Sequence, residues 1–483
     1  MEYVSVPFST IDTLPKVDKE KVRELLQQEQ RDFCRKILVL DDDPTGTQTV
    51  HDVPVVTDWE EETIQKIFEG PDRVTFILTN SRSFSAEKTS CVHREIAERV
   101  AHASKRTGKE FLLLSRGDST LRGHFPLETE ILKDTLSSEL GTEFQGEIIC
   151  PFFLEGGRFT IGNVHYVREG EKLVPAGTTE FAADKTFGYR SSQLGEYVEE
   201  KTGGKYPADQ CIYISIEALR EMRLDEITAK LEQAEHFAKI IVNAADYVDL
   251  EIFCICWIRA MRSGRHYLAR CAASLVRVIG NIDVIPLLSR KVLVDETEKN
   301  GGLVIVGSHV KKTTEQLSEL EKSGCRTAFL EFQAEACMEE DRRVNEINRV
   351  LTESQEAMQK GQTAVVYTSR KLIVPETSDK DKILELSVRI SDALTEIVHR
   401  LSLRPRFIVA KGGITSSDVA TKGLSIRKAK VMGQIKKGIP VWQAGEESKF
   451  PGMPYVIFPG NVGEAATLRE IVEELEGEGE EEA

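Results

Sequence analysis

Short apolar runs alternate with longer helical stretches along most of this chain, and this alternation constrains the fold more than any other feature. The first such run is 36–40, and similar runs follow at 74–78, 111–114 and 146–150. Each run leads into polar or small residues and then into a segment with helical periodicity. Strands separated by helices pair in parallel, because each helix carries the chain back to the same edge of the sheet. We therefore predict an α/β fold built from doubly wound, largely parallel sheets.

The strand–helix series starts a second time near residue 302, with apolar runs at 302–306, 363–367 and 406–410. A chain of 483 residues is long enough for more than one domain, and the two series favour two. The stretch 281–300 is the expected linker between them. We expect an N-terminal extension at 1–35, a first domain at 36–290, a second domain at 300–475 and a disordered acidic tail at 476–483.

The acidic composition narrows the choice of partners. Lys and Arg number 63 and Asp and Glu number 79, which gives a formal net charge of −16. Nucleic-acid binding in general requires a basic face that contacts phosphates, so we expect no nucleic-acid partner. A local cluster of Arg and Lys can still bind a small anionic substrate, whatever the sign of the whole chain.

Nothing in the sequence predicts association with a membrane. No apolar run approaches the roughly 20 residues that a membrane helix needs. The N-terminus lacks the apolar core of a secretory signal. The nine cysteines are scattered and odd in number, as expected for reduced thiols. We therefore expect a cytoplasmic protein.

Charged side chains follow the apolar runs of the first domain. Asp41 to Asp43 follow the first run, Arg82 the second, and Arg116, Asp118 and Arg122 the third. Loops at the carboxyl ends of parallel strands meet at one edge of a sheet. Arg can bind a carboxylate through two nitrogens, and Asp can bind a polyol or accept a proton from a hydroxyl. The alternative for each loop is an ordinary turn or helix cap.

Glycine and hydroxyl side chains follow the apolar runs of the second domain, at Gly307-Ser308, at Lys411–Ser417 and at Pro459–Gly463. Small residues before a helix let backbone N–H groups approach a phosphate, and the helix dipole adds attraction. These loops contain neither a Walker A sequence nor the dinucleotide fingerprint, which weighs against a dehydrogenase. Helix caps remain the alternative here too.

Together the two halves predict a two-substrate enzyme, with a small hydroxylated acid and a nucleotide reacting in the cleft between the domains. Phosphoryl transfer fits this division. It requires a positioned hydroxyl, a nearby carboxylate, Mg²⁺ and dipoles around the phosphates of ATP. Closure of the domains would exclude water and suppress wasteful hydrolysis of ATP.

These motifs resemble those of the four-carbon acid sugar kinases, a family first catalogued as a domain of unknown function. The resemblance covers about 36–475, and the number and order of the short motifs make it specific. The matching segments are Asp42–Gly46, Asp118–Gly123, Gly157–Thr160, His165–Val167, Gly307-Ser308, Thr313–Leu317, Thr368–Arg370, Lys411–Asp418 and Gly460–Gly463.

The resemblance implies transfer of a phosphoryl group from ATP to the terminal hydroxyl of threonate, erythronate or 3-oxo-tetronate. It implies that Asp42 and Asp43 lie at the sugar acid, one of them as a general base. It also implies that Arg82, Asp118, Ser119 and Arg122 hold the substrate, and that Ser308, Gly412, Gly413, Thr415, Gly460 and Asn461 line the ATP site.

Several points stay open at the level of sequence. Many relatives carry a shorter first motif without Pro44, so neither the sugar acid nor the choice of base is fixed. The scaffold could act on another small polyol or hydroxy acid, or could serve as a sensor that binds a nucleotide or metabolite without catalysis. The roles of His51 and His165, and the oligomeric state, for which a homodimer is one option, are also undecided.

Overall fold

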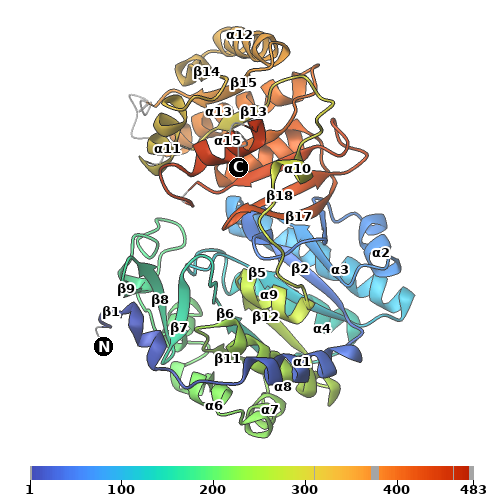
Figure 1. Cartoon of the computed structure of the whole chain (residues 1–483). Coiled ribbons are helices and arrows are strands. Elements are labelled where there is room, and N and C mark those ends of the chain that lie inside the picture. The colour runs from blue at the N-terminus through green and yellow to red at the C-terminus, as the bar shows by residue number, and fades with distance from the viewer. Residues whose placement is uncertain (1–2, 309–310, 371–379, 461, 478–483) are drawn as a thin grey trace. The chain divides into compact units, whose positions relative to one another are not determined.

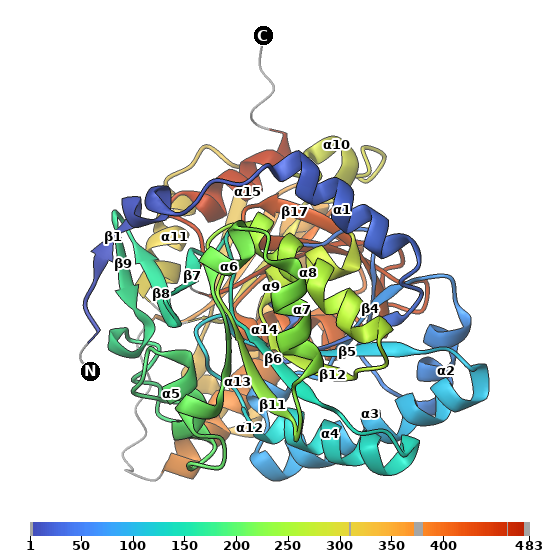
Figure 2. The same ribbon diagram turned by 90° about the horizontal axis from the view of Figure 1, so that it is seen from below.

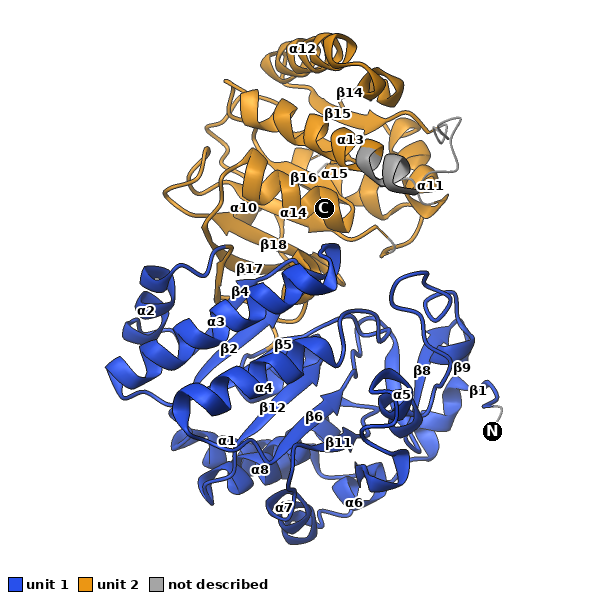
Figure 3. Ribbon diagram, turned by 180° about the vertical axis from the view of Figure 1, so that it is seen from behind, with its two compact units in different colours: residues 1–42, 58–283 blue, residues 43–57, 284–483 orange. Residues whose placement is uncertain are grey.

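The computed structural model describes residues 3–308, 311–370, 380–460 and 462–477 (Figure 1). The chain splits into two compact units (Figure 3). Unit 1 comprises 1–42 and 58–283, and unit 2 comprises 43–57 and 284–483. Each unit is an α/β unit, which confirms the predicted fold class. Most of the predicted acidic tail, from residue 478 on, lies outside the described residues.

Unit 1 is built on a parallel sheet whose strands follow the order β10-β11-β6-β12-β5-β2-β4. These strands are rich in Val, Ile and Leu and almost wholly buried, as expected for a sheet covered on both faces. Their bounds are β2 (Lys36–Asp41), β4 (Val74–Leu78), β5 (Phe111–Arg116), β6 (Gly146–Cys150), β10 (Ile212–Ile214), β11 (Ala238–Val242) and β12 (Tyr267–Cys271).

The helices of unit 1 form two groups, as a doubly wound sheet requires. In one group α3 packs on α2 and α4, and in the other α1, α7 and α9 pack on α8 (Figure 2). The helices are α1 (Lys19–Arg31), α2 (Glu61–Glu69), α3 (Ala86–Thr107), α4 (Leu127–Leu140), α5 (Leu194–Lys201), α6 (Ile216–Arg220), α7 (Leu224–Glu232), α8 (Tyr247–Arg262) and α9 (Ala273–Gly280).

The predicted N-terminal extension is an integral part of unit 1. Asp18 caps α1 by accepting hydrogen bonds from two backbone N–H groups, and Val22 and Leu26 bury one face of the helix. Strand β1 (Val6–Pro7) joins a small antiparallel sheet in the order β1-β9-β8-β7. The other strands of that sheet are β7 (Arg158–Ile161), β8 (Val164–Glu169) and β9 (Lys172–Pro175).

Unit 2 contains a mixed sheet in the order β3-β17-β18-β19-β16-β13-β15-β14. The strands from β19 to β14 are parallel, and β3, β17 and β18 pair antiparallel. The strands are β3 (Pro54–Val56), β13 (Leu303–Val306), β14 (Thr327–Phe332), β15 (Thr363–Thr368), β16 (Ile408–Lys411), β17 (Lys428–Lys436), β18 (Ile439–Ala444) and β19 (Pro454–Phe458). The helices are α10 (Arg290–Leu293), α11 (Lys311–Glu321), α12 (Glu340–Gln359), α13 (Lys380–Arg400), α14 (Gly413–Asp418) and α15 (Thr467–Glu476). Among the described residues, no helix has the length and apolar character needed to cross a bilayer.

Residues 43–57 belong to unit 2, although the predicted boundaries assign them to the first domain. Strand β3 pairs with β17, with Val55 opposite Ala429. The indole N–H of the buried Trp442 donates to the hydroxyl of Thr47 at 3.0 Å. The segment is therefore tied to unit 2 by a strand pairing and by a buried hydrogen bond.

One ion pair lies within the core of unit 1. Lys239 of β11 and Glu147 of β6 are opposite each other in the sheet, and both are fully buried. The ammonium of Lys239 bonds the Glu147 carboxylate and lies 3.9 Å from the ring centroid of Phe237 and 4.2 Å from that of Tyr206. Each charge therefore depends on the other for its partner in a region that excludes water.

We expect Glu147→Leu to destabilise unit 1 by about 3–5 kcal/mol, because it leaves the Lys239 ammonium buried without a counter-charge. Hydrogen exchange of the β6 and β11 amides would report the loss as reduced protection. The double variant Glu147→Leu, Lys239→Met removes both charges and should recover most of the protection. Unchanged protection in the single variant would contradict this account of the pair.

Candidate functional site

The carboxyl ends of neighbouring strands bring acids and arginines together in unit 1. The register of the sheet puts Asp41 of β2 beside Arg116 of β5, and Arg116 Nη1 bonds Asp41 Oδ1 at 3.1 Å. Arg82, from the loop after β4, bonds both oxygens of Asp42, with Nη2–Oδ1 at 2.6 Å and Nε–Oδ2 at 3.1 Å. The Asp42 carboxylate thus receives the two-nitrogen contact that guanidinium groups make with carboxylates.

Asp42 is only 2% exposed, and its surroundings have opposing effects on its pKa. Burial raises the pKa of Asp42 above its ordinary value, while the guanidinium groups of Arg82, Arg116 and Arg270 oppose that rise. Because both oxygens already accept hydrogen bonds from Arg82, this carboxylate orients the arginine.

The loop after β5 contains a second acid–arginine pair. Arg122 Nε donates to Asp118 Oδ2 at 2.6 Å, and the Thr120 hydroxyl donates to the same oxygen. Burial opposes ionisation of Asp118, but Arg122, Arg82 and Thr120 outweigh it and hold the pKa of Asp118 below its ordinary value. The loop closes with Gly123 at φ +128°, where a side chain would meet Arg270.

His165 supports this loop from β8. Its Nε2 lies 2.7 Å from the carbonyl oxygen of Ser119, which can only accept, so Nε2 carries the proton. Its Nδ1 lies 3.0 Å from the hydroxyl of Thr160. Burial lowers the pKa of His165 to about 4, so the ring is neutral at physiological pH. His165, one of the two histidines whose roles the sequence left open, is therefore a positioning residue for the loop that carries Asp118 and Ser119.

Two arginines of unit 1 were not among the predicted site residues. Arg270, at the end of β12, donates from Nη1 to Glu128 at 2.6 Å and to the Ser115 hydroxyl at 3.0 Å. Arg158 of β7 is half-buried, and its buried Nε has no hydrogen-bond partner among the described residues. The guanidinium carbons of Arg122 and Arg158 lie 5.1 and 5.7 Å from the Phe181 ring centroid. Arg158 stands within a matched motif, which is the signal that could have identified it.

In unit 2 the predicted glycine and hydroxyl residues come together. The register aligns the ends of β13, β16 and β19, so the loops that follow these strands meet. A Cβ added at Gly460 would lie 3.3 Å from Ser308 Oγ and 4.0 Å from the Gly412 Cα. One added at Gly412, which has φ +122°, would lie 3.1 Å from Thr415 Oγ1. Gly413 begins α14, and the predicted Asn461 lies outside the described residues.

Asp43 lies with these loops and not with Asp42. Its Oδ1 accepts a hydrogen bond from the backbone N–H of Thr45 at 2.7 Å and another from the Thr45 hydroxyl. Its Oδ2 lies 3.8 Å from where a Cβ on Gly413 would be. Two acids joined by one peptide bond are thus divided between the units, Asp42 in unit 1 and Asp43 in unit 2.

Arg370 fixes the first of the glycine-containing loops and was also not among the predicted site residues. Its Nη2 donates to the carbonyl of Ser308 at 2.8 Å and to the hydroxyl of Thr314 at 2.9 Å. The Thr313 hydroxyl lies 3.1 Å from that of Ser308.

Within the part of the chain that is described, no group of three or more His, Cys, Asp or Glu side chains could hold a metal ion.

Lys411 lies beneath the same loops at the end of β16 and is fully buried. Its Nζ donates to the Pro459 carbonyl at 3.1 Å and lies 3.7 Å from the Phe458 ring centroid. Burial, together with the charge of Lys312, lowers the pKa of Lys411 from 10.5 to about 7. The lysine therefore braces the Pro459-Gly460 turn from inside unit 2.

Family comparisons match both halves of the chain. Residues 37–279 match the model of a sugar-binding N-terminal domain, and 303–468 match that of a nucleotide-binding C-terminal domain. No curated protein matches the chain significantly.

Two solved structures share the fold. One is a Salmonella typhimurium LT2 protein provisionally described as a tRNA synthase, at 16% identity and a TM-score of 0.62, covering 90% of this chain and 98% of that one. The other is a Haemophilus influenzae protein catalogued under a domain of unknown function, at 16% identity and a TM-score of 0.58. That match covers 90% of this chain and 99% of the other. At 16% identity, the similarity to these two structures shows a shared fold and does not extend to function.

Lys411 makes the stability of unit 2 depend on pH. The unfolded chain keeps this lysine charged up to pH 10.5, whereas the folded protein keeps it charged only below about pH 7. Between these values folding releases a proton, so stability rises with pH, and the full cost of the buried charge is felt below pH 7.

We expect Lys411→Met to raise the melting temperature most near pH 7, with the gain shrinking as the pH approaches 10. Scanning calorimetry across that range would measure it, with the exposed Lys428→Met as the matched control. A gain that does not change with pH would contradict the lowered pKa.

Proposed function

We propose that this chain, which belongs to the four-carbon acid sugar kinase family, transfers the γ-phosphoryl group of ATP to a four-carbon sugar acid. The acceptor would be the terminal hydroxyl of a threonate, erythronate or 3-oxo-tetronate. The division of Asp42 and Asp43 carries the proposal. One acid belongs to the arginine cluster of the sugar-binding half, and the next lies against the glycine-containing loops of the nucleotide-binding half.

The arginine cluster of unit 1 suits a small carboxylate. Arg158 keeps a buried guanidinium nitrogen without a partner, and Arg122 lies against the same Phe181 ring. A buried unpaired donor is costly, and a bound carboxylate would remove that cost. Asp118, ionised because its pKa is lowered, can accept hydrogen bonds from sugar hydroxyls. We therefore assign Arg82, Asp118, Ser119, Arg122 and Arg158 to binding of the sugar acid.

The loops of unit 2 suit the phosphates of ATP. Gly412 and Gly413 leave the backbone at the start of α14 open to a close approach, and Ser308 and Thr415 add hydroxyl groups beside it. Mg²⁺ would neutralise charge on the phosphates, and it commonly binds through phosphate oxygens, water and one or two carboxylates.

Asp43 is the better candidate for the general base. A base needs a carboxylate oxygen that can reach the acceptor hydroxyl. Both oxygens of Asp42 are held by Arg82, whereas Asp43 contacts Thr45 through Oδ1. Its Oδ2 faces the loop assigned to the phosphates, where the proton of the attacking hydroxyl must be removed.

We expect ADP release with at least one acid from a panel of tetronates, pentonates and their 3-oxo forms. Asp43→Asn should lower turnover by about 10²–10⁴-fold while leaving ATP affinity nearly unchanged, because the acid acts on the hydroxyl. Asp52→Asn, from the same segment, is the matched control and should keep full activity.

Wild-type turnover in Asp43→Asn would show that Asp43 is not the general base. ATP binding without ADP release for any acid in the panel would instead favour a nucleotide sensor.

The glycine-containing loop can be tested separately by calorimetry with ATP. A Cβ at Gly413 has no neighbour closer than Asp43 Oδ2 at 3.8 Å, so Gly413→Ala should fold and bind normally. Gly413→Val extends branched methyl groups toward the phosphate position and should weaken ATP binding by about ten-fold or more. Equal ATP affinity in the two variants would exclude this loop from the nucleotide site.

A further inference from the structure

A cavity of about 430 Å³ opens at the amino-terminal edge of the unit 2 sheet. Residues just before β13, β14, β15 and β16 line it, together with the last residues of α12 and α15. The glycine-containing loops described above lie at the opposite edge of the same sheet. Five residue steps of extended chain separate Gly302 from Gly307, which is about 17 Å. The cavity is therefore a separate feature of unit 2.

The cavity is strongly basic. Four of its lining side chains are cationic, and none of the four forms an ion pair with another described residue. Three of them donate side-chain hydrogen bonds to backbone carbonyl groups: Lys299 to Glu296, Arg326 to Lys360 and Arg406 to Glu298. The four cations are Lys299, Arg326, Lys360 and Arg406, and the acid that lines the cavity is Glu476.

The negative carboxyl ends of two helices offset only part of this positive charge. The carboxyl ends of α12 and α15 meet the cavity, and each carries about −0.5 of an elementary charge. With Glu476 the negative side sums to about −2 against +4 from the side chains. Among the groups that line the cavity, roughly two positive charges therefore remain in excess. Glu296, which pairs with Arg290 and is not a lining residue, also attracts Arg406 and Lys299.

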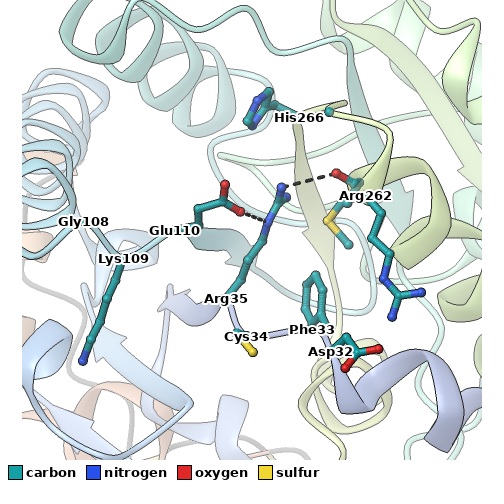
Figure 4. Close-up of a pocket in the computed structure, with 11 residues that line it drawn as sticks. Asp32, Phe33, Cys34, Arg35, Gly108, Lys109, Glu110, Arg262 and His266 are labelled. Carbon is teal, nitrogen blue, oxygen red and sulfur yellow. Dashed lines mark hydrogen bonds and ion pairs between the residues drawn. The ribbon is translucent and has the colours of Figure 1, made fainter.

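The comparable cavity in unit 1 has a smaller excess of cationic side chains among its lining residues. That cavity, of about 500 Å³, lies at the amino ends of β2 and β5 (Figure 4). Arg35 Nε pairs with Glu110 at 2.8 Å, Arg262 pairs with Glu29, and Lys109 donates to the Phe68 carbonyl at 2.6 Å. Burial lowers the pKa of His266, which keeps its ring neutral. In unit 1 three lining cations face two lining acids, Asp32 and Glu110, whereas in unit 2 four lining cations face one.

We propose that the basic cavity of unit 2 binds a small dianion of the phosphate monoester class. Its volume suits a small phosphorylated metabolite, and its excess charge matches one phosphate dianion. Its aromatic lining residue, Phe407, is buried beneath Gly302 and offers no face on which a nucleobase could stack. The ligand would therefore carry a phosphate without a base, at a site distinct from the one assigned to ATP.

Calorimetry with glycerol 3-phosphate and with inorganic phosphate, in buffer free of other multivalent anions, tests the site. We expect both probes to bind wild-type protein, with the monoester tighter if the cavity contacts more than the phosphate. Arg326→Gln with Lys360→Gln should weaken binding by about ten-fold or more, because two charge-assisted hydrogen bonds are lost. Both side chains are exposed, as is that of Lys299, so Lys299→Gln provides an independent second variant.

Two controls separate this site from others. Lys230→Gln removes one half-exposed cation from unit 1 and should leave binding unchanged. Gly413→Val alters only the loop assigned to ATP and should also retain the probe. Binding that is lost in Gly413→Val but kept in the cavity variants would place the probe at the nucleotide loops and overturn the proposal. Absence of binding at about 10 mM of either probe would overturn it as well.

Discussion

The paired contacts between the Asp42 carboxylate and Arg82 hold together the loops on which the sugar-binding half depends. Asp42 leaves β2, and Arg82 comes from the loop after β4. Arg116, at the end of β5, reaches the neighbouring Asp41. None of these charges is well hydrated, so each requires the others, and the ends of three strands are locked into one arrangement. The buried acid is thus a structural centre as well as a part of the site.

Much of this fold is predictable from the sequence because parallel α/β sheets have a strong local signal. Buried runs such as Ile37–Leu40 and Leu303–Val306 mark strands, and the residues after them mark the functional edge. No local sequence pattern predicts that residues 43–57 belong to unit 2. Strand β3 has only three residues, and its partner β17 begins at Lys428, so only the folded chain shows the pairing.

The candidate site divides in the same way. Small residues after adjacent strands identify the loops at Gly307, Gly412 and Gly460, because register alone brings them together. The sequence does not identify Arg270, because this residue lies within a strand whose other residues look like core. Its position becomes clear only from the pairing of β12 with β5. The sequence also treats Asp42 and Asp43 as equivalent, whereas their surroundings differ completely. The catalytic and binding roles of these residues stay predictions.

The membership of residues 43–57 in unit 2 affects the order in which the chain can fold. Strand β3 cannot pair with β17 until Ala429, the residue opposite Val55, has been synthesised, about 370 residues later. At roughly 5–20 residues per second, that delay is about 20–70 s on the ribosome. Throughout it, an apolar strand from the early part of the chain remains without its partner. Unit 1 can complete its sheet first, but unit 2 cannot begin from its own earliest strand, and a fragment starting at Val284 would lack that strand altogether.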